Sequence, residues 1–226
     1  NGGDQARHIR SWLNDDASPS TLLELIKKRA FNFELVLAGT SAGSMIWDTM
    51  TFGGGDSFGT LYYENTIGLA PKTVKDGAVG GTGLADTRNG TKSLQYDHNG
   101  AKMPAFNFID FTVDTHFNAR GRLGRLPPAL VDLRQDLGIG IDENTSFYYN
   151  NGIGTVYGWN GVTIVDLKQA IIKPQPYYTV SGIVGHYLTA GDSYDFNSKL
   201  VFSNKTVIKS PYYVNPTDSS DILKAY

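Results

Sequence analysis

The stretch Phe33–Ser44 reads Phe-Glu-Leu-Val-Leu-Ala-Gly-Thr-Ser-Ala-Gly-Ser, and it decides the fold that the sequence predicts. Its first half, Phe33–Ala38, is an apolar run broken by one glutamate, which is typical of a strand buried on both faces of a parallel sheet. The second half, Gly39–Gly43, fits the G-x-S-x-G pattern, in which a serine stands on a tight turn between a strand and a helix. We therefore expect an α/β fold with Phe33–Ala38 central in the sheet and Ser44–Met50 helical.

The rest of the chain favours a mostly parallel sheet flanked by helices, with a more antiparallel C-terminal half. Ser18-Pro19-Ser20 comes directly before leucines at helical spacing and predicts a helix start. The whole chain is interpreted as a single domain, 1–226, that contains a Gly-rich insertion at residues 51–103. The later segments are expected to be a strand over Phe106–Val113, a helix over Ala119–Leu137, and strands over Leu137–Ile141, Ser146–Tyr149, Ile153–Tyr157, Val162–Leu167, Tyr177–Leu188 and Leu200–Ile208.

Composition excludes several classes of function. The chain has 226 residues, 40% of them hydrophobic, and a net charge of -2 without a basic run, so neither nucleic acid nor an anionic membrane surface is an expected partner. No apolar run approaches the roughly 20 residues that a membrane helix needs. Cysteine does not occur, which excludes disulfides, thiol nucleophiles and cysteine-ligated metals within this sequence. We expect neither a metal nor a cofactor.

Ser41, at the centre of the G-x-S-x-G pattern, is a candidate nucleophile. The small residues around it let the backbone pass closely, and the backbone N–H of Ala42 would face a substrate oxyanion from the helix start. The alternative is a strand–helix turn whose small residues serve packing alone. A serine nucleophile needs a general base. Composition does not choose among the histidines of the chain, which are His8, His98, His116 and His186.

Four motifs, in this order, resemble those of the cyanophycinase and dipeptidase E family of serine peptidases. Gly2-Gly3-Asp4-Gln5 resembles the family's G-G-N/D-Q loop, and Gly39–Ser44 its serine turn. The segment Asp114–Leu126 is similar to D-Q-H-F-x-x-R-x-R-x-x-R-L, with Thr115 in place of Gln. Gly138–Thr145 is similar to G-I-G-I-D-E-x-T. A looser resemblance continues through Leu188–Phe196.

The resemblance implies a serine exopeptidase that hydrolyses aspartyl peptide bonds in peptides or in a cyanophycin-like polymer. It implies Ser41 as nucleophile, His116 as general base and then general acid, and Glu143 as the carboxylate that orients the imidazole. The backbone of Gly3 would complete the oxyanion hole with Ala42, and His8 and His186 should lie outside the site. The residues expected to line or brace the substrate site are Gln5, Asp114, Thr115, Arg120, Arg122 and Arg125. A salt-bridge network that holds the helix is the alternative for the arginines.

A catalytically inactive relative, which kept the fold as a secreted binding or structural protein, is the alternative function. The 13 tyrosines and 11 phenylalanines favour it slightly, and the intact Ser41, His116 and Glu143 favour the enzyme. Besides a peptide substrate, we expect an additional N-terminal segment or chain of the same precursor, docked against residues 33–38, and a homodimer is possible. A secreted or extracellular location is expected, with the cytoplasm as the alternative. Three glycosylation sequons, a number close to chance, begin at Asn89, Asn144 and Asn204.

Overall fold

The computed structural model describes residues 1–3, 8, 11–14, 18–48, 51, 52, 57, 106, 108–133, 135–173 and 179–203. The insertion predicted at residues 51–103 lies outside the described residues apart from positions 51, 52 and 57. Gln5, His98, Asn89 and Asn204 also lie outside them.

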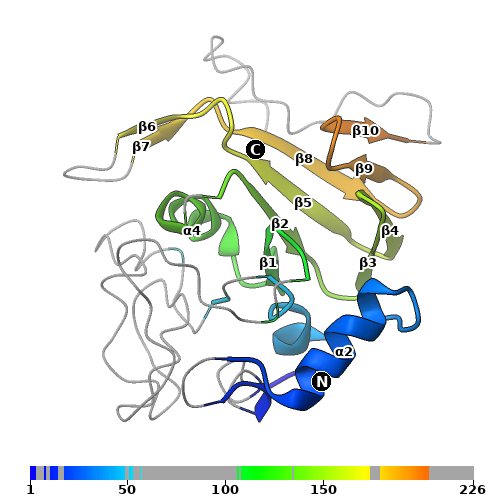
Figure 1. Cartoon of the computed structure of the whole chain (residues 1–226). Coiled ribbons are helices and arrows are strands. Elements are labelled where there is room, and N and C mark those ends of the chain that lie inside the picture. The colour runs from blue at the N-terminus through cyan, green and yellow to red at the C-terminus, as the bar shows by residue number, and fades with distance from the viewer. Residues whose placement is uncertain are drawn as a thin grey trace.

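A four-stranded sheet forms the centre of the molecule (Figure 1). Its strands, in the order β1-β2-β5-β8, are Thr112–Thr115, Leu137–Ile141, Gly161–Asp166 and Val184–Thr189. The pair β1 and β2 is parallel, and β5 pairs antiparallel with both β2 and β8. The described sheet is therefore mixed, with one parallel pair where the sequence predicted mostly parallel strands.

The antiparallel C-terminal half predicted from the sequence is confirmed. A second four-stranded sheet, antiparallel throughout, has the order β10-β9-β4-β3, and the ranges are Leu200–Phe202, Ser193–Asp195, Ile153–Gly158 and Thr145–Asn150. The strands β6, Ile171–Lys173, and β7, Thr179–Ser181, form a separate hairpin. Apolar side chains from both four-stranded sheets share one core, whose buried members are Phe111, Val113, Leu137, Ile139, Val156, Val162, Ile164, Leu188 and Tyr194.

The opposite face of the central sheet carries helix α4, Leu126–Leu133, and the N-terminal part of the chain. Residues alternate between faces along β2, so Gly138 and Gly140 face this side. A side chain at Gly138 would press on Leu126 and Leu130, and one at Gly140 would overlap the ring of Phe117. The two glycines therefore allow α4 and Phe117, the residue after His116, to pack directly on the sheet.

The helix predicted after Ser18-Pro19-Ser20 is confirmed as α2, Thr21–Phe31. The Ser20 side chain accepts a hydrogen bond from the backbone N–H of Leu23 at 3.3 Å, which caps the first turn. Glu24 in the first turn and the basic Lys28 and Arg29 in the last turn complement the helix dipole. Among the described helices, none is long and apolar enough to cross a membrane.

The prediction that residues 33–38 form a central strand is wrong. The backbone N–H groups of Phe33 and Glu34 bond back to the end of α2, and Phe33 has a positive φ of 59°. From residue 35 to residue 40 the chain pairs with none of the described strands, and Val36 is 85% exposed. An apolar run becomes a strand only where a neighbouring backbone supplies hydrogen-bond partners, and within the described residues none does.

Three other predicted elements differ in extent. The strand predicted over residues 106–113 begins later, at Thr112. The helix predicted over residues 119–137 is limited to a 3-10 turn, η4 at Arg122–Gly124, and to α4, whose first turn contains Pro127 and Pro128. Proline is tolerated there because first-turn N–H groups have no intrahelical acceptor. In place of the helix predicted over residues 44–50, a single 3-10 turn, η1 at Ser41–Ser44, precedes irregular backbone to residue 48.

We predict that Gly140→Ala destabilises the protein, because its methyl group would overlap the buried ring of Phe117. Overpacking of a core costs about 1–3 kcal/mol, which is measurable as a lower urea midpoint. The matched control is Gly185→Ala in β8, where a new methyl group would meet only the carbonyl oxygen of Ile164 at 3.9 Å. Equal urea midpoints for the two variants would contradict the packing described here.

Candidate active site

Ser41 occupies a strained turn that its neighbours hold in place. Thr40 is extended, and Ser41, the first residue of η1, has a φ of 52°. The backbone N–H of Gly43 donates to the carbonyl of Thr40 at 2.9 Å, and Ser44 Oγ donates to the carbonyl of Ser41 at 2.7 Å. A non-glycine residue at such a φ costs about 1–3 kcal/mol, so it persists only where surrounding contacts fix it. Strain of this kind is concentrated at functional sites.

Gly39 and Gly43 make this turn possible because their backbones face each other at close range. A side chain on Gly39 would overlap the backbone of Gly43, and one on Gly43 would overlap the backbone of Asn1. The glycines of the G-x-S-x-G pattern thus serve close backbone approach, as the sequence predicted. The N-terminal residues pass beside the same turn, since an ideal Cβ on Gly2 would lie 3.3 Å from the Cβ of Ser41.

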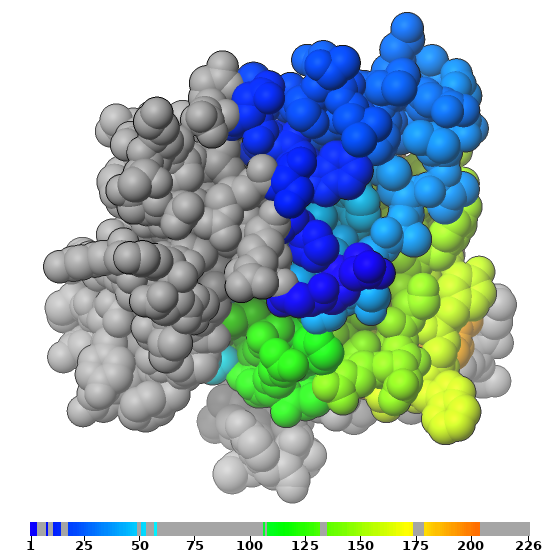
Figure 2. Space-filling view, turned by 90° about the horizontal axis from the view of Figure 1, so that it is seen from below, coloured from blue at the N-terminus to red at the C-terminus, as the bar shows by residue number. Residues whose placement is uncertain are grey.

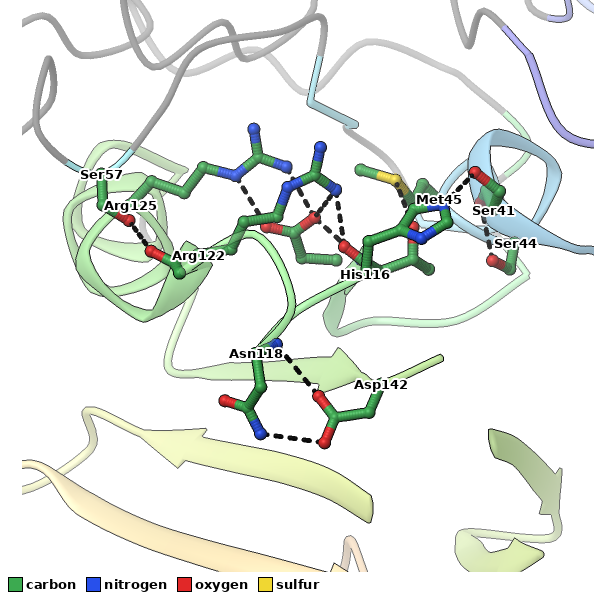
Figure 3. A network of polar contacts seen from close by, with 12 residues as sticks. Ser41, Ser44, Met45, Ser57, His116, Asn118, Arg122, Arg125 and Asp142 are labelled. Atoms are coloured by element: carbon green, nitrogen blue, oxygen red, sulfur yellow. Dashed lines mark hydrogen bonds and ion pairs between the residues drawn. The ribbon is translucent and has the colours of Figure 1, made fainter. Parts of the chain in front are cut away.

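Ser41, His116 and Glu143 form one continuous line of contacts. Ser41 Oγ lies 2.8 Å from His116 Nε2, and His116 Nδ1 lies 3.0 Å from Glu143 Oε1 (Figure 3 shows the serine and the histidine). The contacts predicted among these three side chains are therefore present. Each imidazole nitrogen has its own partner, which is the arrangement that a histidine needs to accept a proton from a serine while a carboxylate orients the ring.

The parallel pair of strands explains how the histidine and the glutamate meet. His116 is the residue directly after β1, and Glu143 follows β2 by two residues. Because β1 and β2 are parallel, both strands end at the same edge of the sheet. His116 turns there with a φ of 51°, and the buried Phe117 packs on Gly140 behind it. Figure 2 shows that the segment of residues 108–133, in green, meets the N-terminal residues, in blue, on one face.

Glu143 is held mainly through its backbone. Its side chain is 48% exposed, whereas its carbonyl accepts hydrogen bonds from Asn160 Nδ2 at 2.7 Å and from Thr145 Oγ1 at 3.1 Å. Asn160 was missed by the sequence reasoning, because it lies 17 residues beyond Glu143 and outside every motif. Its contact follows from the β3–β4 hairpin, which returns the chain to the end of β2.

A buried ionic cluster lies beside the histidine. The fully buried carboxylate of Asp114 accepts from Arg125 Nε at 2.7 Å and Nη2 at 2.6 Å, and from Arg122 Nη1 at 3.1 Å. Figure 3 labels both arginines and marks their contacts with dashed lines. The guanidinium of Arg125 also lies over the ring of Phe52, 4.3 Å from the ring centroid. Asp114 and Arg125 thus form a buried salt bridge, which agrees with the alternative that the arginines belong to a salt-bridge network.

Arg122 differs from Arg125 because it reaches the surface. Its side chain is 15% exposed, and Nη1 donates at 2.5 Å to the carbonyl of Thr115, directly before His116. Burial lowers the pKa of Arg122 to about 10, against the opposing effect of Asp114, so the group is still cationic at neutral pH. Arg120 is exposed, and its backbone N–H donates to the carbonyl of His116 at 3.0 Å.

The other residues considered from the sequence lie in different parts of the fold. Thr115 is buried, and its hydroxyl points to Met45 Sδ at 3.2 Å. Gly3 has a φ of 127°, and the buried Ala42 is the second residue of η1. His186 lies on β8, at the opposite edge of the central sheet from β1, and burial lowers its pKa. Across the described residues, no group of three or more His, Cys, Asp and Glu is arranged to hold a metal.

The known proteins similar to this chain that are described next are all named cyanophycinase. The chain is 30% identical over 207 residues to a protein named cyanophycinase from Trichormus variabilis, covering 88% of this chain and 57% of that protein. It is 31% identical over 166 residues to the cyanophycinase of Geminocystis herdmanii, covering 73% of this chain and 47% of that protein. The cyanophycinase of Synechococcus elongatus is 28% identical over 208 residues, or 88% of this chain and 52% of that protein. The chain spans about half the length of these relatives. No protein-family model matches it.

We predict that Arg125→Met destabilises the fold by about 3 kcal/mol, because removal of one partner from a buried ion pair leaves an undercompensated charge. The free energy of unfolding from urea titration measures the effect. Arg29→Met is the matched control, since Arg29 and Glu34 form a pair at 3.1 Å with about half of each side chain exposed. Loss of such a surface pair should cost less than about 1 kcal/mol. Equal losses in the two variants would argue against a structural role for Arg125.

Proposed function

The chain belongs to a cyanophycinase-like family, and from this premise we propose that it is a serine peptidase that cleaves aspartyl peptide bonds. The observation that carries the proposal is the continuous contact from Ser41 Oγ through the His116 ring to Glu143, at 2.8 and 3.0 Å. A strained, positive φ at both Ser41 and His116 adds support, because such strain is retained where geometry serves function.

In the proposed mechanism, Ser41 Oγ attacks the carbonyl carbon of the scissile bond while its proton passes to His116 Nε2. Glu143 stabilises the imidazolium that forms and keeps Nδ1 as a donor. The negative charge on the carbonyl oxygen is stabilised by the backbone N–H groups of Gly3 and Ala42. His116 then gives its proton to the leaving amine, and the C–N bond breaks. Water, deprotonated by His116, releases the acyl group from Ser41.

The proposed substrates are aspartyl peptides or a cyanophycin-like polymer. Arg122 supports this class because it is cationic at neutral pH and partly exposed beside the histidine. Its contacts with Asp114 and with the Thr115 carbonyl both use Nη1. A guanidinium has five N–H donors in a planar fork, so Nε and Nη2 suit a substrate carboxylate geometrically. Asp114 and Arg125 then contribute by fixing Arg122, and Arg120 by its charge at the surface.

We predict that Ser41→Ala abolishes both labelling by a fluorophosphonate probe and hydrolysis of β-aspartyl-arginine dipeptide. Loss of a serine nucleophile lowers kcat by about 10⁶-fold in a well-studied serine protease, which would take hydrolysis below detection. The variant should keep its urea midpoint, since alanine removes one hydroxyl and no packing. Ser181→Ala, on the exposed edge of the β6–β7 hairpin, is the matched control and should react like the wild type.

The same experiment separates the two functions considered. Wild-type protein that is folded yet unlabelled by the probe would favour the inactive relative. Labelling at a residue other than Ser41, identified by mass spectrometry, would overturn the assignment of the nucleophile. Labelling at Ser41 without cleavage of the dipeptide would leave the serine chemistry intact and reject this substrate.

A further inference from the structure

Asp142, the residue before Glu143, is nearly buried and accepts three hydrogen bonds. Its Oδ1 accepts from the backbone N–H of Asn118 at 3.0 Å, and its Oδ2 accepts from Asn118 Nδ2 at 2.8 Å. Oδ2 also accepts from the hydroxyl of Tyr187 at 2.9 Å. Figure 3 shows the amide of Asn118 facing this carboxylate. These three donors are neutral groups, and together they cover both carboxylate oxygens.

The three residues come from separate parts of the fold. Asp142 follows β2, Asn118 lies two residues after His116 in the turn that follows β1, and Tyr187 belongs to β8. Asp142 therefore ties the turn that carries His116 to the segment that carries Glu143. Its backbone N–H also donates to the carbonyl of Gly161 at 3.0 Å, which anchors the same segment to β5.

Tyr187 is itself held in a fixed orientation. A side chain at Gly161 would overlap the Tyr187 ring, so the ring lies directly on the glycine backbone. In the antiparallel register, Gly161 pairs with Thr189 and Thr163 with Tyr187, which places the tyrosine beside the start of β5. The hydroxyl can then reach across β5 to the end of β2. Through Tyr187, the edge strand β8 therefore contacts the residue directly before Glu143.

We propose that Asp142, with Asn118 and Tyr187, positions the His116–Glu143 pair; the proposal rests on the proposed function of that pair. Two observations create the need for such positioning. Glu143 is 48% exposed, so water competes for its carboxylate, and His116 has a φ of 51°, which a free turn would relax. The contact between Nδ1 and Oε1 therefore depends on the distance between the turn after β1, which carries His116, and the segment after β2, which carries Glu143. Asp142 belongs to the segment after β2 and accepts hydrogen bonds from Asn118 in the turn after β1.

Loosening this connection has a consequence that a purely structural role lacks. A hydrogen bond from Nδ1–H to an ionised carboxylate is short, and its proton resonates far downfield in an NMR spectrum. A longer contact with Glu143 therefore moves the Nδ1 proton signal of His116 upfield. Replacement of Tyr187 by phenylalanine changes no charge, so a change in this signal reports geometry.

The test compares Tyr187→Phe and Asn118→Ala with a matched control, Tyr157→Phe, which removes an exposed hydroxyl on β4. NMR measures the chemical shift of the His116 Nδ1 proton, and fluorophosphonate labelling at pH 7 measures the reactivity of Ser41. We expect both test variants to move the Nδ1 proton signal upfield and to slow labelling about tenfold or more, as small misplacements of reacting groups do. The control should match the wild type in both measurements. Asn118 is exposed, so its truncation should leave the fold intact.

An unchanged Nδ1 proton signal in both test variants would overturn the proposal, even if labelling slowed, because the effect would then be general destabilisation. A control that shifts as far as the test variants would overturn it as well. If the wild type is not labelled but the Nδ1 proton signal moves upfield in both test variants, the proposed peptidase function fails. The positioning of the histidine by Asp142, Asn118 and Tyr187 would still be supported.

Discussion

The parallel ladder between β1 and β2 is the constraint on which the candidate site depends. It pairs Thr112 with Gly138 and Thr115 with Ile141, so both strands end at one level. A slip of β1 by one residue would turn its side chains to the opposite faces of the sheet. Asp114 would then lose its arginines, and Val113 would leave the core. The core on one face and the ionic cluster on the other therefore fix the same register. That register determines where His116 and Glu143 leave the sheet.

Two kinds of unfavourable local structure are concentrated beside this edge. Ser41 and His116 both have a positive φ, and Asp114 carries a fully buried carboxylate. Each is compensated nearby: the turn hydrogen bonds hold Ser41, Phe117 on Gly140 holds the chain after His116, and Arg125 with Arg122 satisfies Asp114. Costs of about 1–3 kcal/mol for each strained residue are large against the stability of a typical domain. These costs are therefore offset by contacts made beside the site itself.

The meeting of Ser41, His116 and Glu143 was predicted from the family resemblance of three short motifs, because the residues alone did not choose among the histidines. Reasoning from local patterns failed for residues 33–38, since an apolar run specifies burial and cannot specify which neighbour will pair with it. It also missed Tyr187 and Asn160. Tyr187 is 45 residues from Asp142, and their contact depends on the register of β5 with β8, which no local pattern encodes. Helix α2 was predictable because its cap, charges and spacing are all local.

The separation of 75 residues between Ser41 and His116 also bears on how the molecule folds. Strands β3 and β4 form a hairpin, and the pairs β2–β5 and β5–β8 join segments that lie closer in sequence than Ser41 and His116 do. Closure of a long loop costs entropy before its contacts repay it, and non-local contacts slow folding. The serine turn is therefore expected to dock late, onto a C-terminal half that is already assembled. Reactivity at Ser41 would then appear only at the last step of folding, so partly folded chains would carry no competent nucleophile.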